Sequence, residues 1–534
     1  MDPTSNRLLR FNDERQSIVS EVVDRVVRST IEESLEMGKP DLEYTLNDVA
    51  FAEIQRYQKQ KDRRSQKKES EWRQFALSLS KLDSVQKRVE LSRLAKVYAT
   101  DVAGNFNPKI YRLAKDIVPS ALSVLLSPVR SIREGVEAFG KVAESVRVEG
   151  AVEKVKACAE RGTIVLTPTH TSNLDSVIIG LALQQTGLPA VTYGAGKNLF
   201  TNPLLGFFMQ NLGAYKVDRR LQFGLYKKTL KVYSQILIER GFHSLFFPGG
   251  TRCRSNRVES KLKLGLLGSA LAAQEHQLGK ANDRPVYVVP LTLNYQIVLE
   301  AESLINDHLV EDGRSAYFLE NDEFGKIGKV IEFLRKTLVH QGEAVIRLGD
   351  PMDVLGHTVD TDGIGRDLRG QAVAIQDFFR SLSGEIEKND QRNKIYTEQT
   401  GRSIARSFKE NTVFMSTVML SRAVYQAAKD RFRTDDIYRI LRVSTTSDTY
   451  SFDEVLRAMD RFRSTVSTHP EFGKIDSKWD GQSSESIALQ ALRLFKEYHT
   501  QKVCYRVGDD LRVSSMDLIY YYQNRAAHVQ EKEK

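Results

Sequence analysis

The sequence predicts an α/β protein in which a largely buried sheet is flanked by helices and preceded by a helical region. Between residues 149 and 360, short apolar runs typical of strands alternate with stretches of helical periodicity. Before residue 105, apolar residues recur at the spacing of amphipathic helices. With 534 residues, the chain is long enough for two or three domains. We predict an N-terminal helical domain at 1–104, amphipathic connecting helices at 105–148 and an α/β domain at 149–360.

The N-terminal region has the pattern of two long helices. Apolar residues at helical spacing predict the first over residues 13–37, and Gly38-Lys39-Pro40 closes it. The second is predicted to begin at Thr45 and to run through a basic stretch towards Trp72 and Phe75. We interpret the basic stretch as a solvated helix face, with a lipid-headgroup or nucleic-acid patch as the alternative. No interleaved aromatic residues support single-strand binding.

The connecting segment that follows is apolar but too short to span a bilayer. Lys109, Arg112 and Lys115 are interspersed among its apolar residues. Two interpretations are open: a core helix, or an interfacial segment that lies on an anionic membrane.

Composition narrows the class of protein further. Apolar residues make up 41% and charged residues 28%, without a detectable repeat, which is typical of a globular chain. The three cysteines are too few and too scattered for a disulfide framework or a metal site, and favour a reducing, cytosolic compartment. The first residues carry no signal sequence, and no stretch of about 20 residues is apolar enough to cross a bilayer. A net charge of +9 suits nucleic acid, anionic lipid or phosphorylated substrates and does not choose among them.

Six strand-like runs are spaced along the predicted α/β domain, and polar motifs follow several of them. Ligands of open α/β sheets bind beyond the carboxyl ends of strands, so this placement suits a catalytic site. The runs are Thr163–Leu166, Ala190–Tyr193, Ala214–Val217, His243–Phe247, Val286–Leu293 and Ala344–Leu348.

The stretch from Thr163 to Asp175 is the predicted active site. An apolar run ends at Pro168 and leads to His170 in a polar turn, and Ser172 or Asn173 is a suitable N-cap for the helix that follows. His170 lies just before the cap and Asp175 in the first turn, so their side chains can converge. Neutral histidine can take a proton from an alcohol while a carboxylate orients its ring. The alternative is a turn histidine with a first-turn helix acid.

Arginines follow two of the other runs. Arg219 and Arg220 come after one strand-like run, and Arg252 and Arg254 come after Pro-Gly-Gly, a turn that lets the backbone approach a ligand closely. Converging guanidinium groups would hold a phosphomonoester bidentately, and Lys263 could add charge. The alternative is that these are surface arginines in loops.

The block His170 to Asp175 resembles the H-x4-D motif of the glycerolipid acyltransferases, the glycerol-3-phosphate and lysophosphatidate acyltransferase superfamily. Three further blocks follow in the family's order: Gly213–Arg219, Phe247–Ser255 and Val288–Thr292. The resemblance implies a mixed sheet flanked by helices, with His170 and Asp175 as the catalytic pair. It implies that Arg219, Arg252 and Arg254 bind the acceptor's phosphate and that Pro290 shapes the acyl-donor side. We add Gly250, Thr251 and Lys263 to the predicted substrate-binding residues.

Two departures from the family pattern bear on activity and acceptor. The third block usually has Glu before Gly-Thr-Arg, whereas this chain has Gly249, so that carboxylate must be supplied elsewhere or is absent. Glycerol-3-phosphate acyltransferases often place Arg after the catalytic His, and Thr171 stands there in this chain.

Other segments resemble the longer glycerol-3-phosphate branch of the family. They imply that residues 361–534 form a C-terminal helical region. The segments are Val286–Glu300, Leu348–Met352, Asn411–Val443 and Tyr520–Asn524.

The resemblance implies an acyltransferase that moves a fatty acyl group from acyl-CoA or acyl carrier protein to the sn-1 hydroxyl of glycerol 3-phosphate, the first step of phospholipid synthesis. It implies direct attack on the thioester, with no metal or cofactor, and backbone N–H groups near the helix start as donors to the oxyanion. We expect a cytoplasmic protein, peripheral on a membrane, that binds no nucleic acid. Lysophosphatidate and dihydroxyacetone phosphate are alternative acceptors. A non-catalytic membrane-associated scaffold would lack contact between His170 and Asp175.

Overall fold

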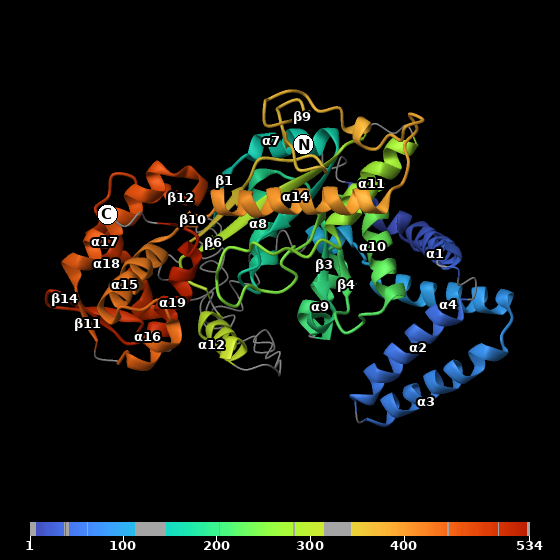
Figure 1. Cartoon of the computed structure of the whole chain (residues 1–534), viewed down its shortest axis with the longest axis horizontal. Helices are drawn as coiled ribbons and strands as arrows, with labels where there is room; N and C mark the ends of the chain where they lie inside the picture. The colour runs from blue at the N-terminus through green and yellow to red at the C-terminus, as the bar shows by residue number, and fades with distance from the viewer. Residues whose placement is uncertain are drawn as a thin grey trace.

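A seven-stranded mixed sheet forms the centre of the computed structural model (Figure 1). The structure describes residues 7–36, 38, 42–60, 62–112, 146–201, 203–280, 284–298, 300–313, 343–445, 448–499 and 501–530. The strand order is β1-β7-β6-β2-β5-β3-β4, and every neighbouring pair is parallel except β6 with β7. The predicted α/β class with a mixed sheet is therefore confirmed. The strands are β1 (Val146–Gly150), β2 (Thr163–Pro168), β3 (Thr192–Gly196), β4 (Ala214–Val217), β5 (Ser244–Leu245), β6 (Val286–Tyr295) and β7 (Ala344–Leu348).

Each of the six predicted strand-like runs coincides with or overlaps a strand of this sheet. The bounds of β4 and β7 are those predicted, whereas β3 begins two residues later than its predicted run. No strand was predicted at the position of β1. This strand lies at the edge of the sheet, pairs only with β7, and carries Arg147 and Glu149 between its apolar residues, so it has no apolar run.

Helices cover both faces of the sheet, as the alternation along β2 requires. Ile164 and Leu166 belong to one apolar cluster with residues of α7 (Val152–Arg161) and α8 (Asp175–Thr186). Val165 belongs to a cluster on the opposite face, with residues of α10, α11 and α14. Those three helices are α10 (Gly224–Glu239), α11 (Leu267–Gly279) and α14 (Asp390–Glu410).

The N-terminal region is helical, as predicted, but its second helix is not continuous. The helix ends at Gln58, and Asp62 caps the start of the next helix by accepting hydrogen bonds from the N–H groups of Arg64 and Ser65. The helices α1 and α4 share an apolar cluster with α10, and Arg25 of α1 pairs with Glu239. How the chain divides into domains stays a prediction. The helices are α1 (Phe11–Glu36), α2 (Glu43–Gln58), α3 (Arg63–Ser78) and α4 (Ser84–Val102).

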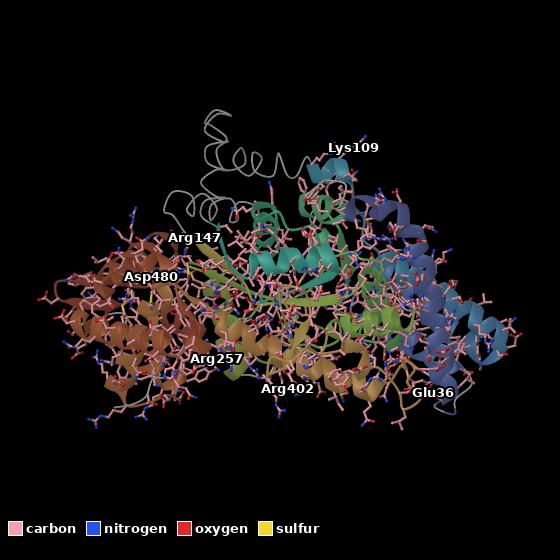
Figure 2. The ribbon with its side chains drawn as sticks, turned by 90° about the horizontal axis from the view of Figure 1, so that it is seen from above. Glu36, Lys109, Arg147, Arg257, Arg402 and Asp480 are labelled. Carbon is pink, nitrogen blue, oxygen red and sulfur yellow. The ribbon has the colours of Figure 1, made fainter. Side chains whose placement is uncertain are left out.

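The C-terminal region lies at the opposite end of the sheet from α1–α4 (Figure 1), and Figure 2 shows the same arrangement from above. It contains a large apolar cluster built mainly from helices. The prediction that this region is helical is incomplete, because two small sheets accompany the helices, β10-β12 and β11-β14-β13. The main helices are α15 (Ser416–Phe432), α17 (Phe452–Thr468), α18 (Ser484–Tyr498) and α19 (Met516–Gln523). The strands are β10 (Val413–Phe414), β11 (Thr449–Ser451), β12 (Lys474–Ile475), β13 (Cys504–Val507) and β14 (Asp510–Val513).

Residues 113–145 of the predicted connecting segment 105–148 lie outside the described residues. Within the described ranges, no helix combines the length and the apolar character needed to cross a bilayer.

Candidate active site

The predicted motifs meet at one edge of the sheet. Strands β6, β2, β5, β3 and β4 are parallel, so their carboxyl ends lie at the same edge. His170 follows β2, Phe247 follows β5, Arg219 follows β4, and Tyr295 ends β6. The fold therefore collects side chains from segments that are more than 120 residues apart in the sequence.

His170 and Asp175 are in direct contact at this edge. Nδ1 of His170 lies 2.8 Å from Oδ2 of Asp175, whose side chain has no exposed surface, whereas the His170 side chain keeps 16% of its surface exposed. The Phe247 ring stacks on the imidazole with a centroid distance of 4.1 Å and an interplanar angle of 23°. The pair therefore presents a ring that is held in orientation by two contacts and remains open to solvent on one side.

The surroundings of Asp175 settle the tautomer of His170. The Tyr295 hydroxyl donates to Oδ1 (2.6 Å), the Thr171 N–H donates to Oδ2 (2.7 Å), and the Ser172 N–H lies within 3.1 Å of both oxygens. With donors on all these sides, the carboxylate acts as an acceptor, and Nδ1 of His170 carries the hydrogen. The lone pair of Nε2 is then available to accept a proton.

The start of α8 differs from the prediction in two ways. The helix begins at Asp175, and the residue before it, Leu174, makes no side-chain cap, so the prediction of Ser172 or Asn173 as the N-cap is wrong. The backbone N–H groups of residues 171–174 all donate to side chains: two to Asp175, one to Glu300 and one to the Ser172 hydroxyl. They are therefore engaged within the protein, and the role of N–H groups near the helix start as donors to a substrate oxyanion stays a prediction.

Glu300 forms a second buried layer behind the turn. Its Oε2 accepts from the Ser172 hydroxyl (2.9 Å), and its Oε1 accepts from the Asn173 N–H (3.0 Å). Nη1 of Arg252 lies 3.5 Å from the same Oε1. Burial raises the pKa of Glu300 above its ordinary value, and these donors together with Arg252 oppose that effect. The turn that carries His170 is thus tied to the arginine of the third motif.

The third motif continues into what we call the arginine loop, residues 247–263. It folds back on itself, since the Lys263 N–H donates to the Pro248 carbonyl (2.7 Å). Gly250 has a φ of +76°, and a Cβ there would lie 2.6 Å from the Lys263 side chain, so glycine suits both the turn and the contact. The Cys253 N–H donates to the His170 carbonyl (2.7 Å). The loop therefore places Lys263 over its own turn and joins that turn to His170.

The other predicted substrate residues of the loop lie on it as follows. Arg252 and Arg254 are half-buried, and Nε of Arg254 lies 3.9 Å from Asp307. Thr251 is exposed. The structure thus brings both arginines and Lys263 into one loop beside His170.

Arg219 lies at the same edge but farther along the sheet. It is exposed in the turn after β4, which is separated from β2 by β5 and β3, roughly 14 Å at ordinary strand spacing. The neighbouring Arg220 forms a two-point pair with Asp218 (2.9 and 2.8 Å). We expect Arg220 to hold this turn, because its guanidinium is engaged there.

Pro290 lies within the sheet and not at its edge. It is buried in β6 opposite Thr167, and its carbonyl accepts from the Gly349 N–H (2.8 Å). Its role on the acyl-donor side stays a prediction.

A C-terminal segment supports the arginine loop from behind. Asn524 donates through Nδ2 to the Ser255 carbonyl (3.0 Å), and Asn256 donates to the Tyr521 carbonyl (3.2 Å). Arg525 is buried and donates to the Leu293 carbonyl near the end of β6 (2.8 Å). Arg257, labelled in Figure 2, lies where the sheet region meets the C-terminal region. The segment Tyr520–Asn524, noted only for its resemblance, is therefore part of the architecture of the site.

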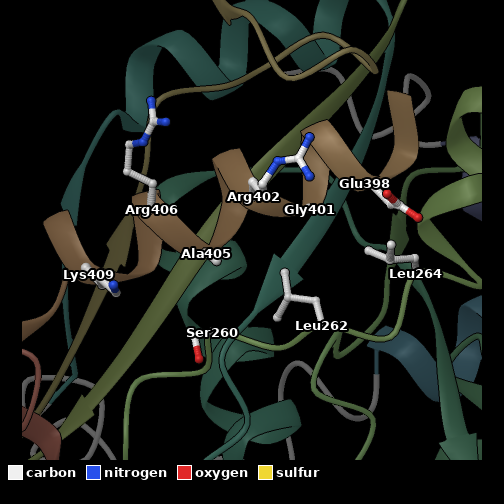
Figure 3. A pocket seen from close by; sticks show the side chains of 9 residues that line it. All are labelled: Ser260, Leu262, Leu264, Glu398, Gly401, Arg402, Ala405, Arg406 and Lys409. Carbon is white, nitrogen blue, oxygen red and sulfur yellow. The ribbon is translucent and has the colours of Figure 1, made fainter. Parts of the chain in front are cut away.

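A separate hollow lies between residues 260–264 and α14 (Figure 3). Neither His170 nor Asp175 lines it. A Cβ at Gly401 of α14 would lie 2.7 Å from the Leu264 side chain, so helix and loop are closely packed there. The residues that line the hollow are Ser260, Leu262, Leu264, Glu398, Gly401, Arg402, Ala405, Arg406 and Lys409.

Among the described residues, no group of three or more His, Cys, Asp or Glu side chains is arranged to hold a metal ion. The three cysteines, Cys158, Cys253 and Cys504, are free thiols. The contacts that define the site are thus those of the His170 turn, the arginine loop and the C-terminal segment.

Comparison with known proteins matches residues 146–294 to the acyltransferase family model. A glycerol-3-phosphate acyltransferase of Pseudoalteromonas atlantica is 24% identical over 271 residues, 50% of this chain and 29% of the relative. One from Aeromonas hydrophila is 28% identical over 273 residues, 51% of this chain and 29% of the relative. One from Haemophilus influenzae is 27% identical over 215 residues, 40% of this chain and 25% of the relative. The chain thus spans less than a third of the length of these relatives.

Proposed function

Because this chain carries an acyltransferase domain and is distantly homologous over half its length to bacterial glycerol-3-phosphate acyltransferases, we propose that it transfers a fatty acyl group from a thioester donor to the sn-1 hydroxyl of glycerol 3-phosphate. The observation that carries the proposal is the contact of His170 with the buried Asp175, at 2.8 Å. A scaffold without catalytic function would have no need of an oriented base that remains open to solvent.

In the proposed reaction, Nε2 of His170 removes the proton from the acceptor hydroxyl as that oxygen attacks the thioester carbon. Asp175 stabilises the imidazolium that forms, and Tyr295 and the backbone N–H groups fix the carboxylate. The tetrahedral intermediate collapses with cleavage of the C–S bond, and the imidazolium returns its proton to the thiolate. The products are the ester and a free thiol, and the enzyme is unchanged.

The acceptor's phosphate is proposed to bind the arginine loop. Arg252, Arg254 and Lys263 lie on this loop, which contacts the backbone of His170 through Cys253. A phosphate held there would keep the neighbouring hydroxyl at a fixed distance from the base. The binding energy of the phosphate would thus orient the hydroxyl for reaction. Arg219 would reach the same acceptor from the turn after β4.

Lysophosphatidate is the second candidate acceptor, because Thr171 stands where glycerol-3-phosphate acyltransferases often have Arg. Either acceptor leads to a lipid, so we also propose that the protein works at a membrane surface on the cytoplasmic side. Acyl-CoA and acyl carrier protein are both retained as proposed donors.

The test is acyl transfer by the purified protein with a long-chain acyl-CoA, comparing glycerol 3-phosphate with lysophosphatidate. His170→Ala is the blank, and its fold is checked by circular dichroism. Transfer to glycerol 3-phosphate supports the proposal, and transfer only to lysophosphatidate changes the acceptor. Silence with both acceptors, repeated with acyl carrier protein as donor, or a wild-type rate in a folded His170→Ala protein, refutes the mechanism.

A further inference from the structure

Gly249 is the position where the third motif departs from the family, which usually has Glu there. Its φ is outside the left-handed region, unlike that of Gly250, so the backbone at Gly249 would accept a side chain. The reason for glycine at this position must therefore come from what surrounds it.

The space beside Gly249 is filled by the carboxyl group of Glu259. A Cβ built on Gly249 would lie 2.0 Å from Oε1 and 2.8 Å from Cδ of Glu259, and its next neighbour, the Thr251 carbonyl oxygen, is 3.5 Å away. A side chain on Gly249 would therefore require the Glu259 carboxyl group to leave this position. The carboxyl group lies where the first atoms of the family's usual glutamate side chain would be, but it comes from ten residues farther along the chain.

Glu259 also contacts the catalytic turn. Its Oε2 accepts a hydrogen bond from the His170 N–H (3.3 Å), while the His170 carbonyl accepts from the Cys253 N–H (2.7 Å). Both backbone polar groups of His170 are thus bound by the arginine loop. Burial of the carboxyl raises the pKa of Glu259 to about 8, so the group is largely neutral at pH 7. A neutral carboxyl can lie close to Asp175 without strong repulsion.

We propose that Glu259 supplies the carboxyl group that the third motif lacks at Gly249, and that it acts as a positioning residue for His170. The inference rests on the proposed acyl transfer. It explains Gly249 as part of an exchange in which the carboxyl group has moved from position 249 to position 259. The lack of Glu at position 249 then no longer argues for a non-catalytic relative.

The test moves the carboxyl group back along the chain. Glu259→Ala removes it and is expected to lower kcat about 10- to 100-fold with little change in KM, since a base displaced by a fraction of an ångström loses alignment. Gly249→Glu alone places two carboxyl groups in one space and is expected to lose activity as well. The double variant that combines Gly249→Glu with Glu259→Ala is expected to regain at least tenfold in kcat over Glu259→Ala.

Two matched variants separate positioning from space filling. Gly249→Ala combined with Glu259→Ala fills part of the space without a carboxyl and is expected to stay as impaired as Glu259→Ala. Glu259→Gln keeps the acceptor for the His170 N–H and is expected to remain within a few-fold of the wild type. Circular dichroism and thermal melts confirm that each variant is folded.

The outcomes distinguish the inference from the proposed function. An active wild type whose double variant shows no recovery, or whose alanine control recovers equally, overturns the role of Glu259 alone. A wild type that transfers no acyl group to either acceptor overturns the proposed function and this inference with it.

Discussion

Removal of one hydroxyl group tests how the site orients its acid. Tyr295 ends β6 and donates to Oδ1 of Asp175 (2.6 Å), and the only other close donor to that oxygen among the described residues is the Ser172 N–H (3.1 Å). Burial, reinforced by the charge of Asp175, raises the pKa of Tyr295 well above its ordinary value, so the hydroxyl stays a donor at all working pH values. Tyr295→Phe deletes this donor and nothing else.

A hydrogen bond to a buried charged group contributes about 1.5–3 kcal/mol, so Tyr295→Phe should lower the free energy of unfolding by roughly that amount. If about half of that energy also orients Asp175 in the transition state, kcat falls roughly 4- to 13-fold, because about 1.4 kcal/mol corresponds to a factor of ten. KM for the acceptor should change little, because Tyr295 contacts Asp175 and not the arginine loop. Steady-state acyl transfer and urea unfolding measure the two effects.

Tyr521→Phe is the matched control. Tyr521 is fully buried, but its hydroxyl has no hydrogen-bond partner among the residues that the structure describes. Its removal should leave both kcat and stability nearly unchanged. If Tyr295→Phe behaves like Tyr521→Phe in both measurements, the proposed role of the Tyr295 hydroxyl is wrong.

The same contacts lead to further predictions. His170→Ala should lower kcat by about 10²–10⁴ without unfolding the protein, and Asp175→Asn should lower kcat more than acceptor affinity; steady-state kinetics with circular dichroism checks both, and an unchanged kcat contradicts them. Arg252→Gln should raise KM for glycerol 3-phosphate roughly tenfold, with a smaller effect on KM for the acyl donor; equal effects on both substrates would argue against a phosphate contact. The pKa of Glu259, about 8 against an ordinary 4.5, means that the folded protein keeps a proton that the unfolded chain loses. The free energy of unfolding should therefore fall as pH rises from about 4.5 to about 8, by less than ~1.4 kcal/mol per pH unit because the side chain is only half-buried, and Glu259→Gln should flatten this slope in melts across pH. Asn524→Ala removes the donor to the Ser255 carbonyl and should lower kcat several-fold with a small loss of stability; a wild-type kcat would show that the arginine loop needs no such support.

The sequence predicted well the parts of the fold that local patterns determine. Runs such as Thr163–Leu166 and Val286–Leu293 are apolar because both sheet faces are covered, so these strands could be predicted. The edge strand β1 has no such signal, because Arg147 and Glu149 alternate with its apolar residues. The break before α3 could have been inferred from Asp62, which is a strong N-cap residue, but helical periodicity on both sides obscured it.

The candidate site also combines contacts that local sequence predicts with contacts that depend on tertiary structure. His170 and Asp175 are five residues apart, so their contact could be argued from local geometry, whereas Tyr295 and Glu259 reach the site only through tertiary structure. A hydroxyl at the end of a buried strand was the one signal for Tyr295. No sequence pattern pointed to Glu259, because its carboxyl group occupies the space that a side chain at Gly249 would fill, and that proximity is not visible in the sequence.

The support of the arginine loop by the C-terminal segment has a consequence for biosynthesis. The Asn524 contact with Ser255 joins residues 269 positions apart, and the Arg525 contact with Leu293 joins residues 232 apart. A ribosome adding about 5–20 residues per second needs more than about ten seconds to make the chain between them. During that interval the His170 turn can fold with β2 and β6, but the arginine loop lacks the contacts that the C-terminal segment makes with it. The nascent chain would thus acquire its base well before it acquires a complete acceptor site, and catalytic competence would wait until residues 524 and 525 had been made.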